Sequence, residues 1–220
     1  MAMGETERRT TAIHEAGHAV VAWFTPGADP VHKVTVIPRG RALGVTWQLP
    51  EKDHMNLSRV QLEARIGVAM GGLLAEDIFL GQATTGAVSD IQHATEIARG
   101  MVCEYGMSAL GPIHFAENQE QVFLGRDLGS RRATSEETAR AIDAEIHRFV
   151  IDNKERARQV ILDHRREMDL LVEALLSHES LDTADLRELF ETGRLERPAP
   201  TPVGAVAPAA TDAAPEAPAP

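Results

Sequence analysis

The sequence predicts a mainly α-helical fold with one small β-hairpin, and three observations support this prediction. Apolar residues recur at intervals of three and four in most of the long segments, which is the spacing of amphipathic helices. Only one pair of neighbouring segments looks extended. The last residues, 198–220, are rich in Pro and Ala and contain no Lys or Arg, so they lack the side chains of a core.

The first elements along the chain are a helix and the hairpin. We expect a helix over residues 5–24, because the Thr-Pro-Gly sequence at 25–27 cannot continue one. Two extended runs follow, over residues 31–37 and from Ala42 to Leu49, separated by a Pro-Arg-Gly-Arg turn. The second run alternates large apolar residues with small or polar ones, which is typical of a half-buried strand.

Two helices are expected next. Ser58 can cap a second helix that Gly81 ends, and apolar residues form an inward stripe along it. Ser89 can cap a third helix that runs to about Tyr105.

The C-terminal half also reads as helical. Thr134 and Glu137 have the spacing of a capping box, and the apolar residues behind them keep helical spacing to about Leu175, which predicts a long helical hairpin. A short helix over residues 183–191 follows.

Composition excludes several classes of function. The net charge of -11 provides no basic surface for phosphate backbones, so we expect no nucleic-acid partner. Cys103 is the only cysteine, which excludes an intramolecular disulfide and a thiolate metal cluster. The apolar runs are far shorter than the ~20 residues that span a bilayer, so we expect this chain alone to be soluble.

One motif points to chemistry. Residues 14–18 read H-E-x-x-H within the first predicted helix, so His14 and His18 lie one turn apart on one face and can bind one Zn²⁺. Glu15 can accept the proton of the attacking water and pass it to the leaving amine. The motif therefore predicts a zincin-like metallopeptidase domain that hydrolyses peptide bonds.

Zinc requires a third protein ligand, and the residues alone leave several candidates. Glu76 lies on the inward stripe of the second predicted helix, whereas Asp77 is turned about 100 degrees away. Asp90 lies in the first turn of the third helix on its apolar face, and His93 is a weaker candidate. A carboxylate that faces a core is costly unless it is paired or bound to metal, so both Glu76 and Asp90 stay open on this reasoning.

The sequence resembles the peptidase domain of the FtsH family of membrane-anchored, ATP-dependent zinc proteases over residues 11–190. The blocks that carry the resemblance are TAIHEAGHA (11–19), KVTVIPRGRALGVTWQLP (33–50), GGLLAED (71–77), TGAVSDI (85–91), YGMS (105–108) and FLGR (123–126). Three features depart from the family pattern: Ile13 replaces Tyr, Leu73 replaces Arg, and the loop over residues 81–86 is short.

This resemblance implies a set of roles and partners. It makes Asp90 the third zinc ligand beside His14 and His18, and it places Glu76 as a neighbour that supports the ligands. By the same resemblance the full-length protein is a homo-hexamer with an AAA+ ATPase module on the cytoplasmic face of a membrane. Its substrates in protein quality control would be unfolded proteins and membrane proteins, and we expect the strand from Ala42 to Leu49 to bind them by β-strand addition.

The chain itself contains no G-x-x-x-x-G-K-[ST] sequence, so we expect it neither to bind nor to hydrolyse ATP. It could be a piece of a longer protein or a free-standing homologue. We expect four segments: a lead-in (1–10), the zinc metallopeptidase core (11–130), a helical part of the same domain (131–193) and a disordered tail (194–220).

A competing hypothesis is a non-catalytic assembly module with a structural metal site. Glu15 argues against it, because a structural site does not need this residue.

Overall fold

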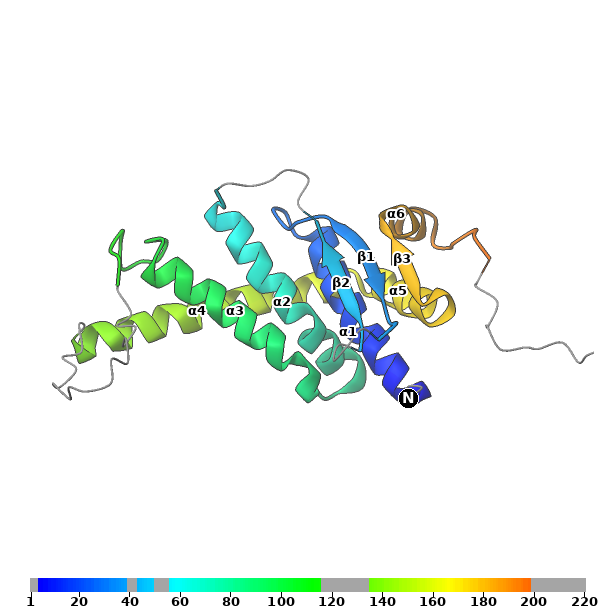
Figure 1. Ribbon diagram of the computed structural model, residues 1–220, viewed down its shortest axis with the longest axis horizontal. Helices are drawn as coiled ribbons and strands as arrows, with labels where there is room; N and C mark the ends of the chain where they lie inside the picture. The colour runs from blue at the N-terminus through cyan, green and yellow to red at the C-terminus, as the bar shows by residue number, and fades with distance from the viewer. Residues whose placement is uncertain (1–3, 39–42, 50–55, 116–134, 199–220) are drawn as a thin grey trace, which may run out of the picture.

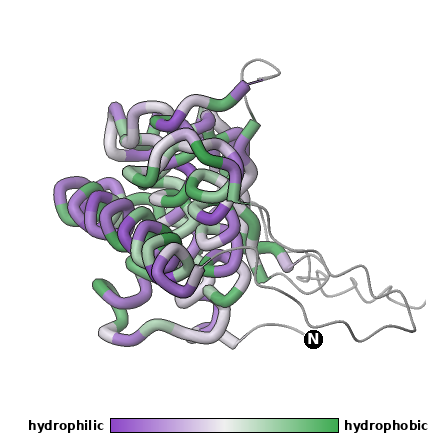
Figure 2. The backbone as a smooth tube through the Cα atoms, turned by 90° about the vertical axis from the view of Figure 1, so that its left-hand side faces the viewer, coloured by the Kyte–Doolittle hydropathy of each residue, from purple (hydrophilic) through white to green (hydrophobic). Residues whose placement is uncertain are grey.

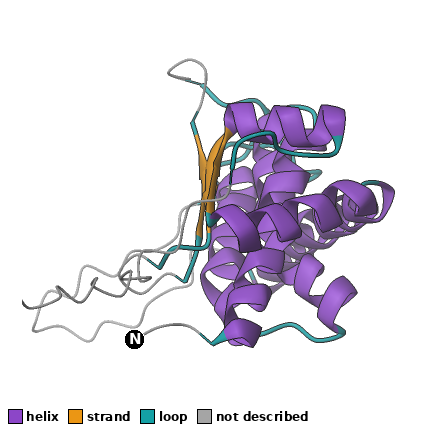
Figure 3. Ribbon diagram, turned by 90° about the vertical axis from the view of Figure 1, so that its right-hand side faces the viewer, coloured by secondary structure: helices purple, strands orange, loops and turns teal. Residues whose placement is uncertain are grey.

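The computed structural model describes residues 4–38, 43–49, 56–115 and 135–198. Helices dominate these ranges, and a small antiparallel sheet stands against one side of them (Figure 3). This arrangement confirms the mainly α-helical prediction. The block FLGR at 123–126, residue Ala42 and most of the predicted Pro/Ala tail lie outside the described residues.

Local signals set the bounds of the helices α1 and α2. Helix α1 spans Glu5–Phe24, as predicted, and begins inside the segment that we expected to be a lead-in. Helix α2 spans Arg59–Leu80, where Ser58 and Gln61 form a capping box. Gly81 ends α2 with a φ of 72°, a left-handed conformation that glycine adopts without strain.

Helix α3 spans Val88–Cys103, and its expected cap is wrong. A short 3-10 helix, η1 (Thr85–Ala87), runs directly into α3, so Ser89 lies inside the helix rather than before it. The side chain of Thr84 caps η1 by accepting from the N–H of Gly86.

Residues 135–198 of the C-terminal half contain three helices, together with one strand that the sequence did not predict. Their bounds are α4 (Glu136–Asp163), α5 (Arg165–His178), β3 (Ser180–Asp182) and α6 (Thr183–Thr192). Ser135 caps α4, whereas Thr134 lies outside the described residues. The predicted hairpin is wrong, because α4 and α5 are interrupted only at His164 and follow one another along the long axis of the molecule (Figure 1).

The sheet has the order β2-β1-β3, and all its pairs are antiparallel. Strands β1 (Val31–Thr35) and β2 (Val45–Gln48) form the predicted hairpin, although both are shorter than expected. Strand β3 pairs with the other side of β1, so among the described strands β1 is central and β2 lies at an edge.

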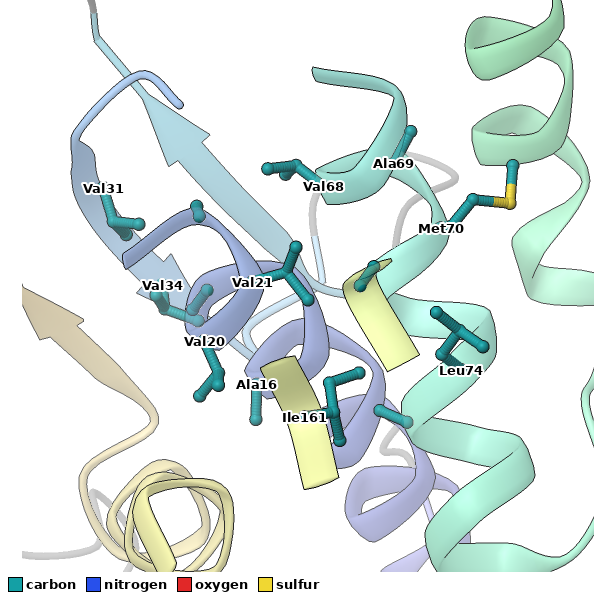
Figure 4. Packing of buried hydrophobic residues seen from close by; sticks show 14 of the residues in the cluster. Ala16, Val20, Val21, Val31, Val34, Val68, Ala69, Met70, Leu74 and Ile161 are labelled. Atoms are coloured by element: carbon teal, nitrogen blue, oxygen red, sulfur yellow. The ribbon is translucent and has the colours of Figure 1, made fainter. Parts of the chain in front are cut away.

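Green and purple segments alternate along the helices in Figure 2, as expected for amphipathic helices that each bury one side. The core lies between α1 and its neighbours (Figure 4), where Val20 of α1 faces Val34 of β1 and Leu74 belongs to α2. Helix α1 is therefore surrounded by the other elements, which fixes the position of the motif that it carries.

Close to the motif, main-chain atoms of α1 and α2 come into direct contact. A Cβ atom added to Gly17 would overlap the carbonyl oxygen of Gly71, and one added to Gly71 would lie 2.7 Å from the carbonyl oxygen of Gly17. A third glycine, Gly72, faces the ring of His14, where a Cβ would lie 2.6 Å from Nε2. Only glycine allows the two helices to approach this closely at the level of the motif.

Candidate metal centre

Three side chains from two helices converge on one point. His14 and His18 lie one turn apart on α1, and Asp90 comes from the first turn of α3. Oδ2 of Asp90 lies 3.3 Å from Nε2 of His14 and 3.5 Å from Nε2 of His18, and the two Nε2 atoms are 3.1 Å apart. We call these three residues the metal cluster; their ligand atoms all lie within 4.8 Å of one another.

The second nitrogen of each imidazole is held by a partner on α2. Nδ1 of His18 lies 2.7 Å from the carbonyl oxygen of Val68, which can only accept a hydrogen bond. Nδ1 of His14 lies 2.7 Å from Oε1 of Glu76. Both Nδ1 atoms therefore donate, and both Nε2 atoms face the same point, where they can bind a metal ion.

Glu76 is the most buried of these polar residues, with 1% of its surface exposed. Its Oε1 accepts from His14 and its Oε2 accepts from the main-chain N–H of Thr84. Glu76 is thus bonded to a ligand candidate and is not a member of the metal cluster.

The remaining candidates do not reach the cluster. Asp77 is directed away from it and forms an ion pair with Arg158 at 2.6 Å. His93 lines the same cleft, but it is not among the residues whose ligand atoms converge.

Charge at the cluster favours a bound cation. Burial alone would lower the pKa of His14, but hydrogen bonding to Asp90, the nearby charge of Glu15 and the bond to Glu76 together raise it to about 9. Burial alone would raise the pKa of Asp90, but hydrogen bonds from His14 and His18 hold it well below its usual range. The surroundings therefore stabilise a positive charge between these side chains.

The donor set fits zinc. Two neutral imidazoles and one carboxylate are a common catalytic zinc set, which leaves one position open. The two Nε2 atoms and Oδ2 of Asp90 lie within 3.5 Å of one another, and Zn²⁺ bound there would take the place of the proton that the raised pKa keeps on His14.

A cleft of about 890 Å³ opens beside the cluster. Its walls are formed by β2 on one side and by residues of α2 and α3 on the other, and His14, Glu15 and His18 all line it. Strand β2 is the part of the expected substrate strand, Ala42 to Leu49, that the structure describes as extended. It lies at the edge of the sheet and borders the cleft.

Glu15 lies beside the cluster with 6% of its surface exposed. The hydroxyl of Thr46, on β2, lies 2.6 Å from Oε2 of Glu15 and 3.1 Å from its main-chain carbonyl oxygen. A Cβ added to Gly44 would lie 2.7 Å from Cγ of Glu15.

Sequence reasoning missed Thr46, Gly44 and the carbonyl oxygen of Val68. The close approach of α1 and α2 had a signal that could have been read: Gly17, Gly71 and Gly72 lie inside helical patterns, where glycine is unfavourable without a packing reason.

The chain is similar to a family of peptidases and to curated bacterial proteins. Residues 1–189 match Peptidase family M41. The chain is 53% identical over 189 residues to the ATP-dependent zinc metalloprotease FtsH of Magnetococcus marinus, a match that covers 86% of this chain and 28% of that protein. It is 45% identical over 213 residues to the ATP-dependent zinc metalloprotease FtsH of Myxococcus xanthus, covering 96% of this chain and 33% of that protein. The chain therefore spans about a third of the length of these relatives.

Proposed function

The chain belongs to peptidase family M41, and from this membership we propose that it is the zinc-dependent endopeptidase part of an FtsH-like, ATP-dependent protease. The observation that carries the proposal is the convergence of His14, His18 and Asp90 at the cleft, with Glu15 buried beside them. In this proposal the first three residues bind Zn²⁺, Glu76 supports His14, and Glu15 is the general base.

Zn²⁺ held by these residues supplies Lewis acidity, which polarises the scissile carbonyl group and makes a water molecule easier to deprotonate. Glu15 takes a proton from that water as its oxygen attacks the carbonyl carbon. Glu15 then returns the proton to the amide nitrogen as the C–N bond breaks, so the products are a carboxylate and an amine. The protein contributes position, because α1 fixes Glu15 next to both histidines.

We propose that an extended substrate pairs with the open edge of β2. An edge strand offers unpaired main-chain N–H and C=O groups, and an extended peptide can pair with them whatever its side chains. This mode of binding suits unfolded polypeptides, or polypeptides that an unfoldase delivers.

The partners of the full-length protein are also proposed from the family. We expect a homo-hexamer with an AAA+ ATPase module at the cytoplasmic face of a membrane, acting on unfolded proteins and membrane proteins. The support is the similarity to proteins about three times as long, which are named as ATP-dependent proteases. Within the described residues, none of the helices is long and apolar enough to cross a bilayer.

The substitution Glu15→Gln tests the function. It should leave zinc content unchanged and lower hydrolysis of unfolded casein at least ~100-fold, because it removes the proton acceptor but no ligand. Glu7→Gln is the matched control, since Glu7 is an exposed carboxylate on the same helix. A Glu15→Gln variant that binds zinc and keeps activity within tenfold of the parent would contradict the assigned role. A parent chain that binds zinc but cleaves nothing would favour the non-catalytic assembly module.

A further inference from the structure

Strand β2 makes a direct contact with the general base of the proposed function. Thr46 and Glu15 are 31 positions apart in the chain, and the Thr46 hydroxyl lies 2.6 Å from Oε2 of Glu15. That distance is typical of a hydrogen bond from a hydroxyl to an ionised carboxylate, which is about twice as strong as a neutral one. Because Glu15 is buried, its carboxylate depends on such partners in place of water.

Gly44 limits the same side chain from a second direction. A Cβ atom at this position would lie 2.7 Å from Cγ of Glu15 and 2.8 Å from its Oε1. The Glu15 side chain is therefore limited by the main chain of Gly44, just before β2, and by the side chain of Thr46 on β2. Few rotamers of Glu15 are compatible with both contacts.

We propose that Thr46 is a positioning residue for peptide hydrolysis: its hydroxyl holds Oε2 of Glu15 and leaves Oε1 to take the proton from the attacking water. This inference rests on the proposed role of Glu15 as general base. The hydroxyl of Thr46 is bonded to Glu15, so we expect its effect on the reaction to come from the orientation of Glu15. General-base catalysis depends steeply on such orientation, because a misplacement of about 1 Å can cost ~100-fold in rate.

Strand β2 couples the binding of substrate to the position of the base. Main-chain groups of β2 pair with the substrate in the proposed function, while a side chain of the same strand holds the base. Any shift of β2 when a peptide pairs with its edge is passed to Glu15 through Thr46. Orientation of the base and occupancy of the strand are therefore linked, and loss of the hydroxyl should appear in kcat.

Two substitutions of Thr46 separate the hydroxyl from the rest of the side chain. Thr46→Val keeps the shape and removes the hydroxyl, whereas Thr46→Ser keeps the hydroxyl. Thr46→Val should lower kcat about tenfold to a hundredfold, with KM within about twofold and zinc content unchanged. Thr46→Ser should restore most of kcat. If Thr46→Val does not fold, Thr46→Ala takes its place in the comparison with Thr46→Ser.

Thr35→Val is the matched control in the same sheet. Thr35 lies on β1, pairs with Val45, and donates its hydroxyl to the carbonyl oxygen of Glu179, far along the chain from the cluster. Its loss should lower the melting temperature and leave kcat unchanged.

Two outcomes would overturn the inference: equal kcat for Thr46→Val and Thr46→Ser, or a loss confined to KM or zinc content. Failure of the proposed function is read separately, from Glu15→Gln. If that variant stays active, the base is misassigned, whatever the Thr46 variants show.

Discussion

The two walls of the cleft are built in different ways. On one side, α1, α2 and α3 hold the metal cluster through buried contacts, and each imidazole is bonded at both nitrogens. On the other side, β2 is a four-residue edge strand whose Trp47 is 40% exposed. In the proposed function, metal binding would thus depend on helix packing, whereas substrate binding would depend on an open strand. Damage to one wall should therefore leave the function of the other measurable.

The largest expected effect is on the helical wall. Asp90→Ala should lose zinc and activity together, because it removes one of the three ligand atoms and leaves two imidazoles that cannot hold the ion tightly. Metal content after dialysis and hydrolysis of casein measure the two losses. Asp77→Ala is the control, since it removes a carboxylate that pairs with Arg158 outside the cluster. Stoichiometric zinc in the Asp90 variant would refute its assignment as a ligand.

A smaller effect is expected at Glu76, which contacts a ligand candidate and not the metal position itself. Glu76→Ala should weaken zinc binding ~10 to 100-fold without abolishing it, because His14 keeps its Nε2 but loses the partner that orients its ring. Competition with a chelator measures the affinity. Glu76→Gln should lie between the parent and Ala, since its side-chain oxygen can still accept from His14 without a charge. If Glu76→Ala held no zinc while Asp90→Ala held it fully, the two roles would be exchanged.

The smallest effect is expected on the strand wall. The N–H of Leu49 donates to the carbonyl oxygen of Pro30, so the alternation of the strand turns the N–H of Gln48 toward the open edge. Gln48→Pro removes that donor, which is worth about 1 kcal/mol, and should raise KM several-fold with zinc content unchanged. Gln48→Ala is the control, because it keeps the N–H and loses only the side-chain bond to Asp29. Equal KM values in the two variants would count against strand addition.

The sequence predicted local features of the fold better than distant ones. The bounds of α1 followed from the Thr-Pro-Gly stop after Phe24, and those of α2 from Ser58 and Gly81, because these signals act within one or two turns. No stop or cap residue of this kind marks strand β3 in the sequence. Its three residues are extended because they pair with Lys33 to Thr35, about 150 positions earlier in the chain.

The same limit applies to the site. The H-E-x-x-H spacing places two imidazoles on one face of a helix, but periodicity alone left both Glu76 and Asp90 open. Family resemblance favoured Asp90, and the structure brings its carboxylate to both histidines while Glu76 meets Nδ1 of His14. Thr46 could not be found by spacing at all, because its contact with Glu15 depends on how β2 lies across α1.

The glycine contact between α1 and α2 also bears on what happens when the metal is removed. Gly17 lies between the two histidines, and its main chain touches that of Gly71, so neighbouring peptide groups set the spacing of the helices there. Most of the conformational entropy of the ligand side chains is then lost when the chain folds, before any ion binds. A chelator should consequently yield an empty but folded protein that takes up zinc again without refolding. In a zinc finger, by contrast, the ion itself supplies the folding free energy.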